Sequence, residues 1–316
     1  MPAVGLKDCY CDLYVSYGHA DTGLTVRGRV LEGGRPVLGD SRTGTLGRLR
    51  ATWQLLETDE IAGVEVAVEL LVTNEPSARR GVAGTDQEGF FRVRFEGPLP
   101  PGTWLLRATL AGKSLRAEPI EGRALVHSGD PGIGVISDID DTVLLTGVRD
   151  KAGLIKRVLL STPEEMETFE GAADLYQRLV AAGAPLVFVS GSPWNLEPRL
   201  RSFFELRKFP VAPMLLKDLG IGPEADSLFD HEAYKVRCIE EVLATLPARR
   251  FLLIGDSGEH DPEIYRRVAR EHPDRVAGIY IHRVTEEPLD SPRFAGAFVF
   301  DRYDDAAQDI KRRGLL

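Results

Sequence analysis

Cysteine is scarce in this sequence, and it has no long apolar run. The 316 residues include three cysteines, and Cys9 and Cys11 lie too close together for an ordinary disulfide. So few cysteines, in an odd number, exclude a disulfide-rich scaffold and indicate a reducing compartment. No apolar stretch approaches the ~20 residues of a membrane span, and none follows the initiator Met as in a signal peptide. We therefore expect a cytoplasmic protein with no transmembrane segment.

Positive charge is also in short supply. The chain carries 39 basic and 48 acidic residues, which gives a net charge of −9. A sequence-independent nucleic-acid binder needs a basic face, so nucleic acid is not an expected partner. Most of the imbalance lies beyond residue 130, where 31 acidic residues oppose 24 basic ones. A cation site, if the chain has one, is expected in this second part.

The first part of the chain has the alternating pattern of half-buried antiparallel strands. Leu24–Val30, Val64–Leu70 and Phe91–Phe95 alternate apolar and polar residues, and turn residues separate them. Helical spacing of apolar residues over Leu46–Leu56 predicts one short helix. Several short strands between turn signals favour a β-sandwich, which we predict over residues 1–128. The total length is near twice the usual ~150 residues of a domain and so leaves room for a second one.

Residues 129–316, which begin in a polar Pro/Gly linker, have a different pattern. Short apolar runs alternate there with amphipathic helical segments, which is typical of buried parallel strands covered by helices. One helix is expected to begin at the Thr162–Glu165 capping box, and others at Asp230 and Asp261. We therefore predict a doubly wound α/β domain. Its apolar runs are Ile133–Ser137, Pro185–Ser190, Val211–Leu216, Phe251–Gly255, Val276–Ile281 and Ala297–Phe300.

The polar residues that follow these apolar runs are candidates for a site, because open parallel sheets bind ligands outside the carboxyl ends of their strands. In Asp138–Thr142, three carboxylates within four residues repel one another unless a cation or solvent screens them. In carboxylate-based phosphoryl chemistry, Asp138 could act as nucleophile while Asp140 moves a proton. A solvated acidic turn is the plain alternative. A calcium loop is disfavoured by Val143 and Arg149, and an acidic motif of the terpene-cyclase kind by the preceding strand.

Two further candidates are a serine turn and a helical lysine. Ser190–Gly191–Ser192 follows an apolar run and could hold a phosphate oxygen through hydroxyl and backbone N–H groups, although most Ser–Gly pairs form plain turns. Lys235 lies at the edge of a buried helical stripe. A lysine there usually extends its ammonium group to solvent. Alternatively, Lys235 points into the acidic site and neutralises carboxylate and phosphate charge.

The last candidate is the Gly255–Asp261 segment, which follows another apolar run. Asp256 stands at a strand end and suits a hard cation as an oxygen ligand. Asp261 precedes a proline and either joins the metal or caps its own helix. His260 is expected at the surface or behind the ligands.

The order of these four signals, acid cluster, serine, lysine and acid, is more specific than any one of them. It resembles the haloacid-dehalogenase (HAD) superfamily of phosphotransferases, whose four motifs match Asp138-x-Asp140-x-Thr142, Ser190, Lys235 and Gly255–Asp256-x-x-x-x-Asp261. The fuller segments Ser137–Thr142, Ser190–Asn195 and Gly255–Tyr265 resemble the phosphatidate phosphatase catalytic-domain family, over residues 130–290. The front part resembles a prealbumin-like sandwich through Gly84–Phe91. The implied fold is a HAD-like doubly wound parallel sheet preceded by an all-β sandwich.

The resemblance implies hydrolysis of a phosphomonoester through an aspartyl-phosphate intermediate. Asp138 would attack phosphorus, and Asp140 would protonate the leaving oxygen and then activate water. Ser190, Gly191 and Lys235 would hold the transferring phosphoryl group. The implied cofactor is Mg²⁺, because an anionic nucleophile cannot readily approach an anionic phosphate without a cation between them.

The same resemblance implies the ligands of that Mg²⁺. They would be the Asp138 carboxylate, the backbone carbonyl of Asp140 and the Asp256 carboxylate, with waters completing the shell. Asp261 is the fourth candidate ligand. Asp141 would either support the ligands or face solvent, and Thr142 is expected to hydrogen-bond within the turn.

The substrate is less constrained. Only 52 positions separate Asp138 from Ser190, too few for a sizeable cap, so the site should be open unless the sandwich covers it. An open site suits a bulky phosphomonoester, and the resemblance favours phosphatidate-like lipids, with peripheral membrane contact as one consequence. A soluble metabolite or a phosphorylated macromolecule is the alternative substrate. A catalytically silent phosphate-binding module is the alternative of another class, and the oligomeric state is open.

Overall fold

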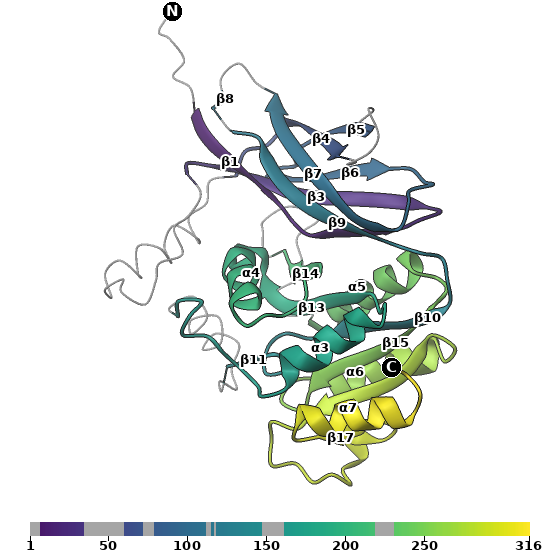
Figure 1. Ribbon diagram of the computed structural model, residues 1–316. Helices are drawn as coiled ribbons and strands as arrows, with labels where there is room; N and C mark the ends of the chain where they lie inside the picture. The colour runs from purple at the N-terminus through teal and green to yellow at the C-terminus, as the bar shows by residue number, and fades with distance from the viewer. Residues whose placement is uncertain are drawn as a thin grey trace, which may run out of the picture. The chain divides into compact units, whose positions relative to one another are not determined.

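The structure is a computed structural model that describes residues 7–34, 60–71, 79–111, 115–116, 118–146, 161–218 and 231–316 (Figure 1). These residues form two compact units. Among them, the first unit ends at Gly129 and the second begins at Asp130. The predicted helix over Leu46–Leu56 and the predicted cap residue Asp230 lie outside the described residues.

The N-terminal unit is a mixed β-sheet with nine strands in its described part. The hydrogen-bonded order is β5-β4-β7-β9-β2-β3-β1-β8, with β6 paired to β3. Most neighbours are antiparallel, as the alternation predicted, but β2–β9 and β1–β8 are parallel. A period-two pattern marks a strand without specifying its partner, so it could not reveal these two pairs. The strands are β1 (Lys7–Leu13), β2 (Ser16–His19), β3 (Gly23–Glu32), β4 (Glu65–Leu71), β5 (Arg79–Gly84), β6 (Phe90–Phe95), β7 (Gly102–Ala111), β8 (Leu115–Arg116) and β9 (Ile120–His127).

The alternating residues of this sheet face a common apolar core. In β6, Phe91, Val93 and Phe95 are buried while Arg92 and Arg94 are exposed. The same core takes buried residues from β3, β4, β7 and β9, so the sheet curls around it. The strands that contribute to this core are therefore apolar on the face that is buried against strands from elsewhere in the sheet.

The C-terminal unit is built on a parallel sheet of six strands in the order β14-β13-β10-β15-β16-β17. Each predicted apolar run contributes one of these strands. The chain starts in the middle at β10, builds outward through β13 and β14, and returns to β15 on the other side of β10. The strands are β10 (Gly132–Ser137), β13 (Leu186–Pro193), β14 (Met214–Lys217), β15 (Arg249–Asp256), β16 (Val276–His282) and β17 (Phe298–Phe300), and a separate short pair consists of β11 (Leu144–Leu145) and β12 (Glu167–Thr168).

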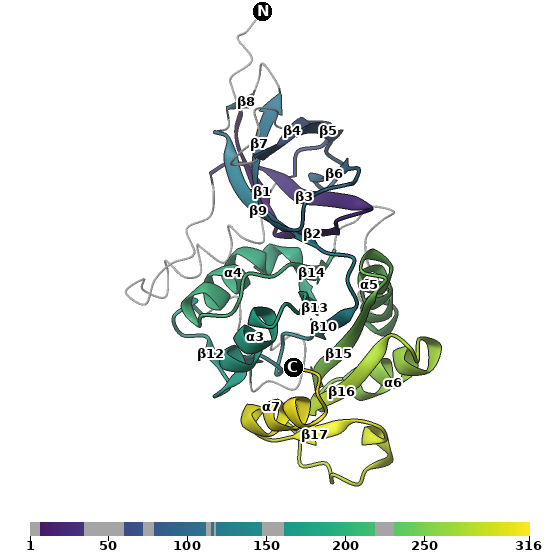
Figure 2. The ribbon, with the colours of Figure 1, turned by 45° about the vertical axis from the view of Figure 1, so that its right-hand side comes forward.

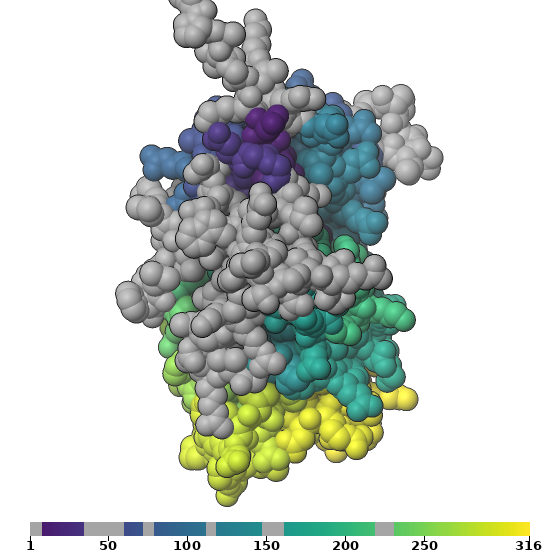
Figure 3. All heavy atoms as spheres, turned by 90° about the vertical axis from the view of Figure 1, so that its left-hand side faces the viewer, coloured from purple at the N-terminus to yellow at the C-terminus, as the bar shows by residue number. Residues whose placement is uncertain are grey.

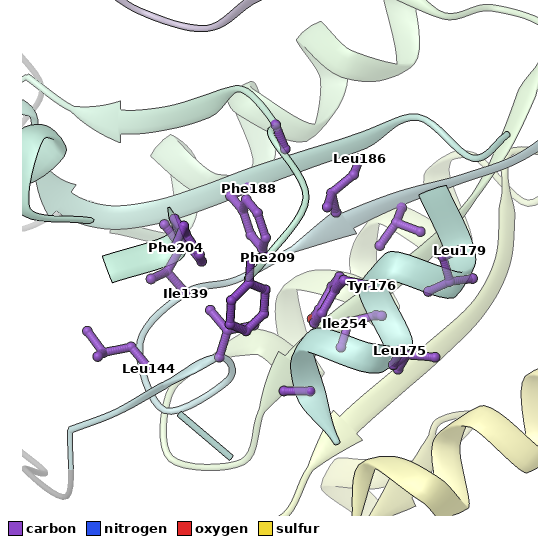
Figure 4. Packing of buried hydrophobic residues seen from close by; sticks show 14 of the residues in the cluster. Ile139, Leu144, Leu175, Tyr176, Leu179, Leu186, Phe188, Phe204, Phe209 and Ile254 are labelled. Atoms are coloured by element: carbon purple, nitrogen blue, oxygen red, sulfur yellow. The ribbon is translucent and has the colours of Figure 1, made fainter. Parts of the chain in front are cut away.

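Helices cover both faces of the parallel sheet (Figure 2). Because both faces are buried, the strands are nearly continuous apolar runs. On one face, Tyr176 lies beside Phe188 and Phe209 in an aromatic core (Figure 4). That face carries α3 (Ala172–Ala181), α4 (Glu197–Leu206) and α7 (Tyr303–Arg312), and the other carries α5 (His231–Thr245) and α6 (Asp261–Glu271).

The last part of the chain closes one edge of this unit. β17 pairs with β16, and α7 packs next to β17. These elements, yellow-green to yellow, form a continuous part of the surface in Figure 3. Of the helices in the described ranges, none has the length and apolar character needed to cross a bilayer.

The helix expected from Thr162 is present as α3, but its predicted start is wrong. Thr162–Glu165 forms turns, and α3 begins only at Ala172. Part of the capping box is present, since the Thr162 N–H donates to Glu165 Oε2 at 3.2 Å. However, the residues that would continue the helix form β12, which pairs with β11. The tertiary pairing therefore prevails over the local capping signal.

Candidate active site

Two acids stand at the ends of neighbouring strands in the middle of the parallel sheet. Asp138 directly follows β10, and Asp256 is the last residue of β15. Ser137 lies opposite Ile254, and the Asp138 N–H continues the ladder with a bond to the Ile254 carbonyl at 2.9 Å. The strand order reverses between β10 and β15, so the register places both acids at the edge where open α/β sheets bind ligands.

Lys235 reaches these acids from α5. Its Nζ lies 2.8 Å from Asp138 Oδ1 and 3.5 Å from Glu259 Oε2, and it also contacts Asp261 Oδ1. The side chain is buried and does not extend to solvent. Burial alone would lower the pKa of Lys235, but attraction by Asp138 and Asp261 raises it well above its usual value. Lys235 is therefore a fixed positive charge within the acidic group.

Asp261 faces into the site and does not cap its helix. It is the first residue of α6, whose N-cap position is His260, and its Oδ2 accepts a bond from the Asp256 N–H at 3.2 Å. Gly255 allows this approach, because a Cβ at that position would lie 2.2 Å from Asp261 Oδ2. Of the two roles that the sequence left open, the geometry disfavours capping and places the carboxylate beside those of Asp138 and Asp256.

These three aspartates form a group that fits a hard cation. One carboxylate oxygen from each of Asp138, Asp256 and Asp261 lies within 4.8 Å of the others, and all three residues are buried. Asp138 Oδ2 and Asp256 Oδ2 have no hydrogen-bond partner among the described residues. Burial raises the pKa of both carboxyl groups well above the usual value, so keeping them ionised requires more positive charge than Lys235 supplies. A divalent cation on these oxygens would supply it.

Asp140 points to a different set of groups. Its Oδ2 accepts hydrogen bonds from Ser190 Oγ at 2.8 Å and Ser192 Oγ at 2.9 Å, whereas Oδ1 has no partner in the described part of the chain. Burial raises the pKa of Asp140 to about 6, with Glu259 adding to the shift and the two serines opposing it. A carboxyl group with a pKa near neutrality can both donate and accept a proton at physiological pH.

Both serines lie within β13, which runs to Pro193 and does not end before Ser190. Ser192 belonged to the predicted serine turn but was given no role of its own, although the sequence holds a signal for one. Residues two apart in a strand point to the same side, so Ser192 should face whatever Ser190 faces. Gly191, the predicted phosphate-binding backbone, lies between them.

The turn after Asp140 is held by its own residues. Asp141 has a left-handed backbone conformation with φ of 53°, and its Oδ1 accepts bonds from the Thr146 N–H at 2.9 Å and Oγ1 at 2.6 Å. Asp141 therefore shapes the turn. The predicted bond of the Thr142 hydroxyl within the turn is wrong, because Thr142 Oγ1 is buried and unpartnered within the described ranges. Its carbonyl oxygen instead accepts a bond from Tyr303 OH, a contact that joins α7 to the site.

The fold and the site together define the class of the C-terminal unit. The parallel sheet is doubly wound and carries acids after its first strand and serines on its second. A lysine and further acids lie around its fourth strand, and this is a HAD-like α/β arrangement. Residues 133–283 match the family model described as "Phosphatidate phosphatase APP1, catalytic domain". This match confirms the resemblance to the phosphatidate phosphatase catalytic-domain family that the motifs predicted.

Curated relatives match over a similar span. An uncharacterized protein of Schizosaccharomyces pombe is 33% identical over 184 residues, which cover 58% of this chain and 30% of the relative. "Phosphatidate phosphatase APP1" of Saccharomyces cerevisiae is 31% identical over 179 residues, which cover 56% of this chain and 30% of that protein. The chain thus spans about a third of the length of these relatives.

Solved structures with similar chains are more distant. A HAD family hydrolase from Deinococcus radiodurans R1 is 18% identical, with a TM-score of 0.39, over 59% of this chain and 98% of that one. D,D-heptose 1.7-bisphosphate phosphatase from B. bronchiseptica is 11% identical, with a TM-score of 0.38, over 57% of this chain and 98% of that one. These values are too low for the neighbours' ligands or reactions to bear on this chain.

Proposed function

We propose that this chain is a Mg²⁺-dependent phosphomonoester hydrolase that acts through an aspartyl-phosphate, with phosphatidate-like lipids as preferred substrates. The observation that carries the proposal is the state of the Asp138 carboxylate. One of its oxygens is paired with Lys235, and the other is buried without a partner among the residues that the structure describes. The family of residues 133–283 and the placement of Asp140 two residues away support the same conclusion.

The proposed reaction has two steps. In the first, an Asp138 carboxylate oxygen attacks phosphorus, and the bond between phosphorus and the ester oxygen breaks. The departing oxygen keeps the electron pair and takes a proton from Asp140, so an alcohol leaves. In the second, a water molecule gives a proton to Asp140 and its oxygen attacks the phosphorus of the aspartyl-phosphate. The bond between phosphorus and the Asp138 oxygen breaks with its electron pair on that oxygen, which regenerates the Asp138 carboxylate and releases inorganic phosphate. Asp140, with a pKa of about 6, suits both transfers.

The residues that would hold Mg²⁺ are Asp138, Asp256 and Asp261, with the Asp140 backbone carbonyl as a further ligand. When bound, the ion supplies positive charge between the anionic nucleophile and the anionic substrate. Two unit charges ~4 Å apart interact by about 4 kcal/mol at an effective dielectric constant of about 20, so this charge offsets a large part of the repulsion.

The phosphoryl group would be held by Lys235, Ser190 and the Gly191 N–H. Lys235 already lies 2.8 Å from the proposed nucleophile, so its ammonium group can contact a phosphoryl oxygen without a large movement. Ser190 is buried on the neighbouring strand and offers a hydroxyl donor. Charge-assisted hydrogen bonds of this kind bind a phosphate more strongly than neutral ones.

The lipid preference has a narrower basis than the chemistry. It is supported by the description of the family and by the name of the Saccharomyces cerevisiae relative. A soluble phosphomonoester or a phosphorylated macromolecule would use the same Asp138 chemistry. An experiment therefore has to identify the preferred substrate independently of the reaction type.

Phosphate release provides that experiment. With Mg²⁺, the purified chain should hydrolyse dioleoyl phosphatidate in mixed micelles faster than soluble glycerol phosphate, and EDTA should stop both reactions. Turnover of the soluble ester alone would replace the lipid by a soluble substrate. No release from either ester or from an aryl phosphate would indicate a phosphate-binding module and overturn the proposal.

A further inference from the structure

Asp140 is held by two hydroxyl groups on the same oxygen. Ser190 Oγ and Ser192 Oγ both donate to Asp140 Oδ2, at 2.8 and 2.9 Å, and all three residues are buried. The Ser192 N–H also donates to Ser190 Oγ at 2.9 Å. A hydroxyl group carries a single hydrogen, so each serine can donate to one acceptor at a time.

Ser190 therefore has one hydrogen for two acceptors. Under the proposed function, Ser190 binds an oxygen of the transferring phosphoryl group, and to donate to it the hydroxyl must turn away from Asp140. The bond from the Ser192 N–H keeps Ser190 Oγ in place while its hydrogen turns. Of the two described hydroxyl donors on Asp140 Oδ2, only that of Ser192 then remains.

We propose that Ser192 is a positioning residue that holds the Asp140 carboxyl group while Ser190 turns to the substrate. This role rests on the proposed function. With Oδ2 fixed by Ser192, the carboxyl group does not rotate, and Oδ1, which has no partner in the described ranges, stays the oxygen that exchanges the proton. The two serines thus have separate tasks: Ser190 binds the phosphoryl group and Ser192 orients the acid.

The test compares Ser192→Ala with wild type in the full chain, with Mg²⁺ present, on two esters. para-Nitrophenyl phosphate has a leaving group that departs without a proton, whereas the alkyl ester, dioleoyl phosphatidate or glycerol phosphate, needs one. Because general acid catalysis contributes about 10²- to 10⁴-fold, Ser192→Ala should lower kcat/KM for the alkyl ester by about 10- to 100-fold and for the aryl ester by less than about 3-fold. The inhibition constant of inorganic phosphate should be unchanged.

Two further variants complete the test. Ser190→Ala is the matched control, and it should lower kcat/KM for both esters and weaken inhibition by inorganic phosphate. Ser192→Thr keeps the hydroxyl and should retain the wild-type ratio of kcat/KM between the two esters. An equal loss on both esters in Ser192→Ala overturns the positioning role and leaves the proposed function intact. No phosphate release by the wild-type chain overturns the proposed function, and the positioning role with it.

Discussion

Lys235 Nζ lies 2.8 Å from Asp138 Oδ1, and both side chains are buried. A buried ion pair is weak evidence for stability by itself, because the desolvation of two charges offsets much of their attraction. Here one cation serves several acids, since Lys235 also contacts Asp261 and approaches Glu259. Its removal would leave more than one buried carboxylate without a counter-charge.

Lys235→Met should therefore destabilise the protein when no metal is present. Removing one partner of a buried pair typically costs about 3–5 kcal/mol in the free energy of unfolding. Urea unfolding in EDTA measures this loss. Lys311→Met, in the last turn of α7 on the surface, is the matched control and should change the stability by less than about 0.5 kcal/mol. Equal stabilities of wild type and Lys235→Met would contradict the importance of the ion pair.

Asp138→Asn should abolish phosphate release and preserve the fold. An amide has nearly the shape of a carboxyl group but cannot act as the nucleophile, so activity should fall on the order of 10⁴-fold or more, as for other nucleophile replacements. Wild type quenched in acid during turnover should carry a phosphorylated aspartate that the variant lacks. Asp130→Asn, at an exposed position, should match wild type. Activity that survives in Asp138→Asn would remove Asp138 from the nucleophile role.

The part of the site that lies at strand ends was predictable from the sequence. Apolar runs locate the six parallel strands, and the geometry of an open sheet brings the residues that follow adjacent strands to one edge. Asp138 and Asp256 meet for this reason. Lys235 was ambiguous, because helical periodicity places a residue at the edge of a stripe without saying whether its charge reaches solvent. The 2.8 Å contact with Asp138 removes that ambiguity.

Local sequence patterns did not predict the features that depend on contacts between residues distant in the chain. The capping box at Thr162–Glu165 predicted a helix, but the pairing of β12 with β11 takes the residues that follow it. The dipeptide Asp261–Pro262 correctly predicted the start of α6, but it could not show that the carboxylate of Asp261 bonds to Lys235 and the Asp256 N–H. β2 pairs in parallel with β9, and no residue near β2 in the sequence indicates this partner.

Mg²⁺ should stabilise the wild-type chain and should stabilise Asp256→Asn much less. A ligand that binds only the folded state adds about 2.7 kcal/mol to the free energy of unfolding at 100 times its Kd. Asp256 Oδ2 is one of the two buried oxygens of the metal group without a described partner. Loss of this oxygen as a ligand should therefore raise the Mg²⁺ concentration that gives half of the maximal stabilisation by about 10-fold or more.

Thermal unfolding during a Mg²⁺ titration, without substrate, measures this effect. Asp290→Asn, an exposed acid outside the metal group, is the matched control and should behave as wild type. A wild-type Tm that does not respond to Mg²⁺ would contradict metal binding by this group. An equal response in Asp256→Asn would remove Asp256 from the ligands.

Arg293 holds the loop that follows Asp256. Its guanidinium donates to the Ser257 carbonyl at 2.6 Å and to Glu263 Oε1 at 2.6 Å, and it also bonds to the Glu259 carbonyl. One planar group thus ties two backbone positions of the loop to the first turns of α6. The same loop fixes the metal group, because Asp256 Oδ1 accepts bonds from N–H groups within it.

Arg293→Ala should therefore raise the Mg²⁺ requirement more than it lowers the maximal rate. Without the guanidinium, the N–H groups of Gly258 and Glu259, now 2.6 and 3.1 Å from Asp256 Oδ1, are held less firmly. Loss of a group that orients a metal ligand typically weakens metal binding by about 10- to 100-fold, so the half-maximal Mg²⁺ concentration for phosphate release should rise by about 10-fold. Arg293→Lys should behave similarly because an ammonium group cannot replace the planar fork, whereas Arg267→Ala on the exposed side of α6 should match wild type. An unchanged half-maximal concentration in both Arg293 variants would show that the loop holds Asp256 without this contact.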